Sequence, residues 1–242
     1  MREPTVCAVM LTADRHELAR RAVQCFRAQT YPAKRLVIYD TSKAAGEIVR
    51  YRGHFQHVVI GGSQQTIGEL RNAANAFADP REVIVHWDSD DWSHPNRIAE
   101  QVALLQSSGA DAVGYNEMLF WRERVESKVG EIDPGAAWLY TGSILGTSLC
   151  YWRKTWERVP FRAQRANPMH DKGVGEDHDF LLDLHAAGMR SVDVNPMYPR
   201  MIARIHGSNT SNAYNPADMA RETQHWKRVP EWDEFCRRTL EA

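Results

Sequence analysis

Residues 83–91 read Val-Ile-Val-His-Trp-Asp-Ser-Asp-Asp, and this stretch carries the strongest fold and site signals in the sequence. Its first part, Val83–Trp87, is a short, mostly apolar run rich in Val and Ile, which is typical of a strand buried on both faces of a parallel sheet. The run ends in Asp88, Asp90 and Asp91, three carboxylates within four residues. Because successive side chains of a strand point to opposite faces, we expect Asp88 and Asp90 on one side and Asp91 on the other.

Three adjacent carboxylates indicate a divalent cation. Carboxylates that lie close together raise each other's pKa unless a cation sits among them. An oxygen-rich site with one or two protein carboxylates suits Mg²⁺ or Mn²⁺, which accept substrate phosphate oxygens as further ligands. The alternative is a solvated loop in which Asp91 or Ser93 caps the following helix. The apolar strand before the motif favours a site for a metal and a diphosphate.

The surrounding first half alternates short apolar runs with segments of helical period. Further strands are predicted at Val6–Leu11, Leu36–Tyr39 and Val58–Ile60. Capping-box patterns, Asp14 with Glu17 and Thr66 with Glu69, predict two helix starts, and a third helix is predicted from near Ser93 to a stop at Gly109. This alternation predicts an α/β fold with a mostly parallel sheet and right-handed crossovers.

Small, hydroxylic or acidic residues follow the four predicted strands. They are Thr12 to Asp14, Asp40 to Ser42, Gly61 to Ser63, and Asp88 to Asp91. Each cluster alone also fits a simple turn, because Asp, Ser and Gly are turn formers. In open α/β sheets, however, ligands bind outside the carboxyl ends of the strands. The four clusters together therefore predict a binding crevice.

The second half has less regular patterning. Strands are predicted within Asp111–Arg122 (one long strand or a pair), Ile144–Trp152 and Met201–Ile205, with a helix over Glu176–Ala187 and a mobile polar loop over Arg162–Gly175. No repeat, low-complexity tract or clear linker separates the halves. We therefore expect one domain over residues 1–242, divided into halves at 1–110 and 111–242.

Two further polar clusters lie in this second half. Gly175-Glu176-Asp177-His178-Asp179 opens the predicted helix, and a carboxylate at a helix start beside a mobile loop is a candidate general base. The helix dipole alone also favours acids in a first turn, which is the alternative reading. His206 follows the last predicted strand; a single histidine in such a place is more often a surface residue than a ligand.

Composition excludes several classes of protein. The chain has 242 residues, 43% hydrophobic and 25% charged, and a formal net charge of −1. A general nucleic-acid binder usually carries a basic excess, so no nucleic-acid partner is expected. The four cysteines are widely spaced without a CxxC pair, which argues against a zinc cluster or a disulfide framework and fits a reducing compartment. No apolar stretch approaches about 20 residues, so we expect no membrane span and a cytoplasmic protein.

The motifs, in their order, resemble the inverting, metal-dependent glycosyltransferases of family 2 with the GT-A fold. The resemblance covers the chain from about Val6 to Ser211. Its elements are Leu11-Thr12 at the end of the first strand, Gln29-Thr30-Tyr31-Pro32, Gly68-Glu69-Leu70-Arg71-Asn72, Asp88-Ser89-Asp90-Asp91 with Pro95, Gly175-Glu176-Asp177, and His206. No single element is diagnostic, whereas the ordered set is specific.

The resemblance implies a function and a role for each matching residue. A glycosyl group would pass from a nucleoside-diphosphate sugar, with UDP-sugars favoured, to the hydroxyl of a glycan, a lipid-linked molecule or another acceptor. The implied roles are Thr12 and Asp40 at the base and ribose, Arg71 near the base or diphosphate, Asp88 at the ribose, Asp90 and His206 as ligands of Mn²⁺ or Mg²⁺ with Asp91 as a rival ligand, and Asp177 as catalytic base beside Glu176. Residues 1–110 would bind the nucleotide sugar and residues 111–242 the acceptor.

Three alternatives remain open from the sequence. A nucleotidyltransferase would show a glycine-rich phosphate loop after the first strand, and 11–18 lacks the glycines. A metal-dependent hydrolase built on His170, Asp171, Asp177 and His178 lacks the HExxH spacing. A non-catalytic sugar-binding module would not need both the acidic motif and Asp177. Separately, the basic run within 153–172 could attract a phosphorylated or lipid-linked acceptor, or be an ordinary solvated surface.

Overall fold

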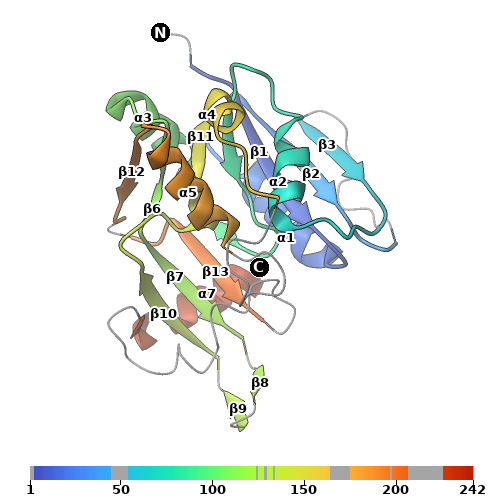
Figure 1. The fold of residues 1–242 in the computed structure, drawn as a ribbon. Helices are drawn as coiled ribbons and strands as arrows, with labels where there is room; N and C mark the ends of the chain where they lie inside the picture. Colours follow the sequence, from blue (N-terminus) through green and yellow to red (C-terminus); the bar gives the residue numbers. More distant parts are fainter. Residues whose placement is uncertain are drawn as a thin grey trace.

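A computed structural model shows two main β-sheets, the smaller lying at the strand ends of the larger, with helices packed on both (Figure 1). The structure describes residues 3–44, 54–123, 125–127, 130–132, 134–163, 175–196, 198–206 and 226–241. Both chain halves contribute to each sheet, because β5 joins the second sheet and three strands of the second half join the first.

The larger sheet has seven strands in the order β12-β6-β11-β4-β1-β2-β3. Its strands are β1 (Val6–Thr12), β2 (Lys34–Asp40), β3 (Phe55–Val59), β4 (Val83–His86), β6 (Ala112–Tyr115), β11 (Cys150–Trp152) and β12 (Ser191–Val194). The four strands of the first half are all parallel, and β11 is the antiparallel member between β4 and β6. The carboxyl ends of β1 to β4 therefore lie at one edge, as the sequence predicted.

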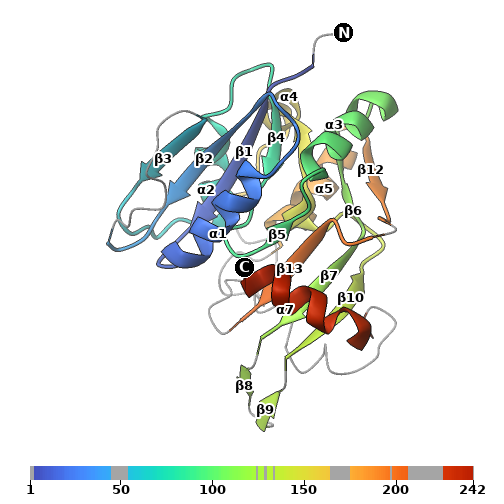
Figure 2. The ribbon, with the colours of Figure 1, turned by 180° about the vertical axis from the view of Figure 1, so that it is seen from behind.

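Helices cover both faces of this sheet. The helices are α1 (His16–Arg27), α2 (Ile67–Asn75), α3 (Arg97–Ser108), α4 (Arg153–Arg158) and α5 (Glu176–Ala186). Alternate residues of β1 divide between two cores: Val6, Ala8 and Met10 pack toward α1 and α3, whereas Cys7 and Val9 pack toward α2 and α5. Figures 1 and 2 show these two helical layers on opposite sides of the sheet.

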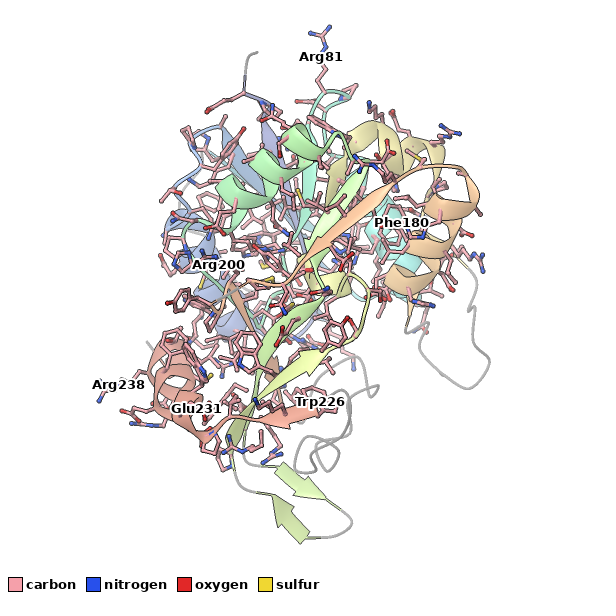
Figure 3. All side chains as sticks on the ribbon, turned by 90° about the vertical axis from the view of Figure 1, so that its left-hand side faces the viewer. Arg81, Phe180, Arg200, Trp226, Glu231 and Arg238 are labelled. Atoms are coloured by element: carbon pink, nitrogen blue, oxygen red, sulfur yellow. The ribbon has the colours of Figure 1, made fainter. Side chains whose placement is uncertain are left out.

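The smaller sheet has five strands in the order β14-β10-β7-β13-β5. Its strands are β5 (Trp92–Ser93), β7 (Glu117–Arg122), β10 (Gly135–Tyr140), β13 (Met201–Ile205) and β14 (Trp226–Arg228), and a short β8–β9 pair (Val125–Ser127, Gly130–Ile132) extends from it. The short 3₁₀ turns are η1 (Gly146–Ser148) and η2 (Pro230–Trp232). The helix α7 (Asp233–Glu241) packs Cys236 and Leu240 on one face of the sheet. Figure 3 shows Phe180 of α5 beside the large sheet and Trp226 on the small one.

Two local predictions, the start of α2 and the end of α3, are confirmed. Thr66 and Glu69 form a capping box at the start of α2, and Gly109 ends α3 in the left-handed conformation. All four cysteines are free thiols. Within the described part of the chain, no helix has the length and apolar character to cross a bilayer.

Two predictions of helix starts are wrong. The Asp14–Glu17 box does not form, because Asp14 has φ +52° and its carboxylate accepts a hydrogen bond from the Lys43 backbone N–H instead. The third helix begins at Arg97, since Ser93 belongs to β5 and pairs with β13. The 111–122 segment forms two strands that belong to different sheets, and the chain passes from one to the other at Asn116. The predicted 162–175 loop lies mostly outside the described residues.

Candidate active site

A cavity of about 950 Å³ opens where the carboxyl ends of the parallel strands face the smaller sheet. Seven of the nine predicted site residues line it: Thr12, Arg71, Asp88, Asp90, Asp91, Glu176 and Asp177. His206, the eighth, contacts Asp90. Segments far apart in the sequence thus converge on one space.

The three carboxylates of the acidic motif separate toward different partners. Asp88 accepts a hydrogen bond from Arg71 at 3.3 Å. Asp91 turns toward the smaller sheet, where it accepts hydrogen bonds from the Thr147 hydroxyl at 2.8 Å and the Arg204 backbone N–H at 3.0 Å. Burial, followed by the negative charge of Asp90 and Asp88, raises the pKa of Asp91 well above its ordinary value. Asp91 therefore ties the two sheets together, and this engagement makes it a poorer metal ligand than Asp90.

Asp90 lies between two basic side chains. Its Oδ2 is 2.6 Å from Arg15 Nη1 and 3.1 Å from His206 Nε2. A carboxylate oxygen and an imidazole nitrogen side by side are suitable ligands for Mn²⁺ or Mg²⁺. Among the residues that the structure describes, no three His, Cys, Asp or Glu side chains form a complete metal site. Asp90 and His206 fit a cation that takes its remaining ligands from a substrate, and Arg15 is its competitor for Asp90.

Three positions of the Gly68–Asn72 motif, which lies within α2, have a clear structural role. A Cβ at Gly68 would overlap the carbonyl oxygen of Arg162, so glycine permits this helix to approach the 161–163 segment. Asn72 accepts a hydrogen bond from the Phe161 N–H and donates one to the Phe161 carbonyl, which fixes the same contact. Arg71 then projects into the cavity.

The Arg71 guanidinium connects the acidic motif with the start of α5. Besides its bond to Asp88, its Nε lies 3.7 Å from Glu176 Oε1. Arg71 is buried, and its Nε and Nη1 have no hydrogen-bond partner in the described structure. Burial, followed by the negative charge of Asp177, raises the pKa of Glu176 to about 7, while Arg71 acts in the opposite direction. Arg71 therefore supplies positive charge beside an acidic cluster.

The start of α5 places Asp177 in the cavity. Gly175 caps the helix with φ +102°, a conformation that favours glycine. The Asp177 carboxyl lies directly against the α-carbon of Gly146 in η1, and a Cβ at Gly146 would overlap it. This close approach fixes one side of the carboxylate, and its other side faces the cavity that it lines.

The two residues predicted at the nucleotide base have different surroundings. Thr12 lines the cavity, and its buried hydroxyl has no hydrogen-bond partner in the described structure. Asp40 is fully buried, accepts hydrogen bonds from Ser42 and His57, and is not among the residues that line the cavity. Burial alone would raise the pKa of Asp40, but these hydrogen bonds outweigh it and lower the pKa. A base contact by Asp40 therefore stays a prediction.

Sequence reasoning missed three residues that complete the site: Arg15, Gly146 and Thr147. Arg15 directly follows Thr12 to Asp14, one of the clusters that the sequence predicts at the crevice. Its position next to this cluster could have identified it as a basic residue of the site. Gly146 and Thr147 carry no local signal, since their contacts with Asp177 and Asp91 arise only from the tertiary fold.

The basic run of 153–172 does not form a cavity wall in its described part. Arg153, Arg158 and Arg162 bind Glu157, the Ala187 carbonyl and Asp183, respectively. His170 and Asp171, which the hydrolase alternative requires, lie outside the described residues.

Comparisons with known proteins agree with this geometry. The model of the family described as glycosyl transferase family 2 matches residues 7–173. A comparison with curated sequences gave no match. The fold is similar to S. aureus TarS residues 1–349 in complex with UDP, with a TM-score of 0.60 and 14% identity over 83% of this chain and 60% of that one.

Two other solved structures extend the similarity. For another S. aureus TarS structure the TM-score is 0.59 and the identity 13%, and the match covers 83% of this chain and 37% of that one. The mannosyltransferase PcManGT from Pyrobaculum calidifontis, in complex with GDP-Man and Mn²⁺, matches with a TM-score of 0.59 and 15% identity over 100% of this chain and 70% of that one. The chain thus spans only about one to two thirds of the length of the TarS structures.

Proposed function

Because the chain belongs to glycosyl transferase family 2 and has the GT-A fold, we propose that it transfers a glycosyl group from a nucleoside-diphosphate sugar to an acceptor hydroxyl, with inversion at the anomeric carbon. We favour a UDP-sugar as donor. The complexes of TarS with UDP and with UDP-GlcNAc support this choice, and the GDP-Man complex of PcManGT makes guanosine the alternative.

The donor would bind along the carboxyl ends of β1 and β4. The unpartnered hydroxyl of Thr12 is available to the nucleoside, and Asp88 can accept a hydrogen bond from a ribose hydroxyl. The unpaired nitrogens of Arg71 offer positive charge near the diphosphate. These groups come mainly from residues 1–110, which we assign to donor binding, with acceptor binding in residues 111–242.

Asp90 and His206 would hold Mn²⁺ or Mg²⁺. When bound, the ion acts as a Lewis acid that stabilises negative charge on the departing diphosphate. Asp90 would provide the anionic ligand, and its neighbour Arg15, which bonds the same Oδ2, would compete with the ion for it. Asp91 stays bound to Thr147 and the Arg204 backbone N–H, and holds β13, with its adjacent His206, close to the motif.

Asp177 would act as the general base. Its carboxylate lines the cavity from α5, so an acceptor that enters between α5 and the smaller sheet could lose its hydroxyl proton to it. Attack from this side, with the diphosphate leaving toward Arg71 and Asp90, inverts the anomeric configuration. Burial raises the pKa of Glu176 to about 7, so this neighbouring carboxyl holds its proton below that pH.

Besides the charged residues Glu176, Asp177 and Arg204, the acceptor side of the cavity has neutral groups in its described part. Phe120, Ala203 and Ile205 contribute apolar surface, and Thr141 and Ser143 contribute hydroxyls. Apolar faces combined with hydroxyl groups suit a sugar ring, so we favour a glycan acceptor over other hydroxyl compounds, including lipid-linked ones.

The observation that carries the proposal is the convergence of Arg71, Asp88, Asp90 and Asp177 on one cavity. Thermal-shift measurements with UDP, GDP and other nucleoside diphosphates, with and without Mn²⁺, test it. A ligand that binds only the folded state raises the unfolding midpoint. We expect one nucleotide to stabilise the chain in a Mn²⁺-dependent way, and transfer from the matching donor. No stabilisation by any nucleotide would overturn the proposal.

A further inference from the structure

The turn η1 contacts both the candidate base, Asp177, and the acidic motif, through Asp91. On its cavity side, the α-carbon of Gly146 packs against the Asp177 carboxyl, and the Thr147 hydroxyl donates to Asp91. These are neighbouring residues of one short turn. The turn therefore sets the separation between the candidate base and the acidic motif.

Buried side chains hold the opposite side of this turn. Its three consecutive carbonyl oxygens each accept a hydrogen bond from a different buried side chain: Gly146 from His86 (2.9 Å), Thr147 from Arg97 (2.9 Å) and Ser148 from Gln101 (2.6 Å). Bonds to three successive carbonyls leave the turn little freedom to shift.

The bond from His86 is the last of a directional chain. Asn75 Nδ2 donates to the Tyr151 oxygen at 2.9 Å, and the Tyr151 hydroxyl lies 3.0 Å from His86 Nε2. The Gly146 carbonyl can only accept, so His86 Nδ1 carries the proton, and Nε2 of the neutral ring accepts from Tyr151. Burial, followed by the positive charge of Arg71, lowers the pKa of His86 well below its ordinary value, which agrees with a neutral ring.

We propose that His86 is a positioning residue for glycosyl transfer: by holding the Gly146 carbonyl, it fixes the place of the Asp177 carboxylate relative to the acidic motif. The role rests on the proposed function. It is distinct from donor binding, because His86 is fully buried and is not among the residues that line the cavity.

The geometry predicts a loss of turnover with little loss of donor binding. The Gly146 carbonyl also accepts from the Leu149 N–H at 3.1 Å, so the turn remains closed without His86 but can move. A displacement of about 1 Å in a reacting group can lower a rate by about 100-fold. The donor contacts of Arg71 and Asp88 do not pass through Gly146.

The test compares His86→Leu with His86→Asn. The asparagine amide can donate to the Gly146 carbonyl much as Nδ1 does, whereas leucine cannot. We expect His86→Leu to lower kcat about 10- to 100-fold, with the donor KM within about 3-fold, and His86→Asn to recover most of the loss. His185→Asn on α5, whose ring contacts Ser191 outside the cavity, is the matched control and should leave kcat unchanged.

Two measurements guard against a folding artefact. Gly146→Ala should lower kcat similarly, because the three heavy atoms nearest to the added Cβ all belong to Asp177. Nitrogen-15 NMR of the wild-type chain should show His86 as the neutral Nδ1-protonated tautomer. A ring protonated on Nε2, a donor KM that rises in step with the fall in kcat, or no recovery in His86→Asn would overturn the role.

The outcomes also separate the role from the proposed function. An inactive wild-type chain, tested with donors and acceptors of the proposed classes, would overturn both. An active wild type whose turnover is insensitive to His86→Leu and to Gly146→Ala would overturn the positioning role alone.

Discussion

The two sheets contribute different things to the cavity. The strand ends and helices of the seven-stranded sheet supply most of its charged groups, including Arg71, Asp88, Asp90 and Asp177. The five-stranded sheet supplies apolar surface, and its cavity-lining Arg204 binds Glu123 and the Leu240 carbonyl. We infer that the seven-stranded sheet provides most of the charged groups of the reaction, whereas the five-stranded sheet contributes His206 and shapes the space that an acceptor would occupy.

The largest effect is expected for Asp177→Asn, which removes the candidate base that the seven-stranded sheet's helix α5 supplies. General-base catalysis typically contributes about 100- to 10,000-fold, so we expect kcat to fall by about 1,000-fold with donor affinity retained. Steady-state kinetics together with donor binding by calorimetry measure both. The matched control is Asp183→Asn on the same helix, whose carboxylate binds Arg162 away from the cavity. Turnover close to wild type in Asp177→Asn would remove the residue from the role of base.

Replacement of Asp90 should have the next largest effect. Asp90→Asn removes the anionic partner of His206, so we expect the Mn²⁺-dependent rise in the unfolding midpoint to disappear, with transfer reduced by about 100-fold. Asp91→Asn is the contrast, since Asp91 binds Thr147 and should not be needed for the metal response. If Asp91→Asn abolishes the response and Asp90→Asn preserves it, the ligand assignment is reversed.

We expect Glu176→Gln to change how the free energy of unfolding depends on pH. The folded state binds a proton at Glu176 up to a pKa of about 7, whereas the unfolded carboxyl has a pKa of 4.5. The wild type therefore loses stability as the pH rises from about 4.5 to 7, by up to about 3 kcal/mol. The variant should lack this decline in urea unfolding series. An equally steep decline in both proteins would contradict the prediction.

Arg162→Ala should have the smallest effect. The guanidinium is exposed and binds Asp183 at 2.6 Å, and it does not line the cavity. Exposed ion pairs contribute little to stability. We expect an unchanged acceptor KM and unfolding midpoint, measured by kinetics and thermal unfolding. A raised acceptor KM would restore the idea that the basic run attracts a charged acceptor.

The sequence predicted the large sheet better than the small one for a physical reason. Val6–Thr12 and Val83–His86 are buried on both faces, and short apolar runs mark such strands locally. The Thr66–Glu69 capping box is equally local and is confirmed. By contrast, Trp92–Ser93 is a strand only because it pairs with β13, more than 100 residues later in the chain. No window of sequence around Ser93 contains that partner.

The site shows the same limit. The motifs predicted which acids gather at the cavity, because strand ends and helix starts are marked in the sequence. They did not predict that Arg15 would donate a hydrogen bond to Asp90, or that Gly146 would lie against Asp177. Both contacts depend on the tertiary fold. The Asp14 capping prediction was wrong for a related reason. Asp14 N–H donates to Ser42, so a contact with the β2 end, rather than the local pattern, sets its conformation.

The position of β13 between β7 and β5 has a consequence for the order in which the protein can assemble during synthesis. The ribosome produces β5 and β7 long before residues 201–205, so the middle of this sheet is missing while most of the chain already exists. Native pairings across such long sequence separations form slowly. We therefore expect the nascent chain to build its parallel sheet early and to acquire a functional cleft only after residue 205 has left the exit tunnel.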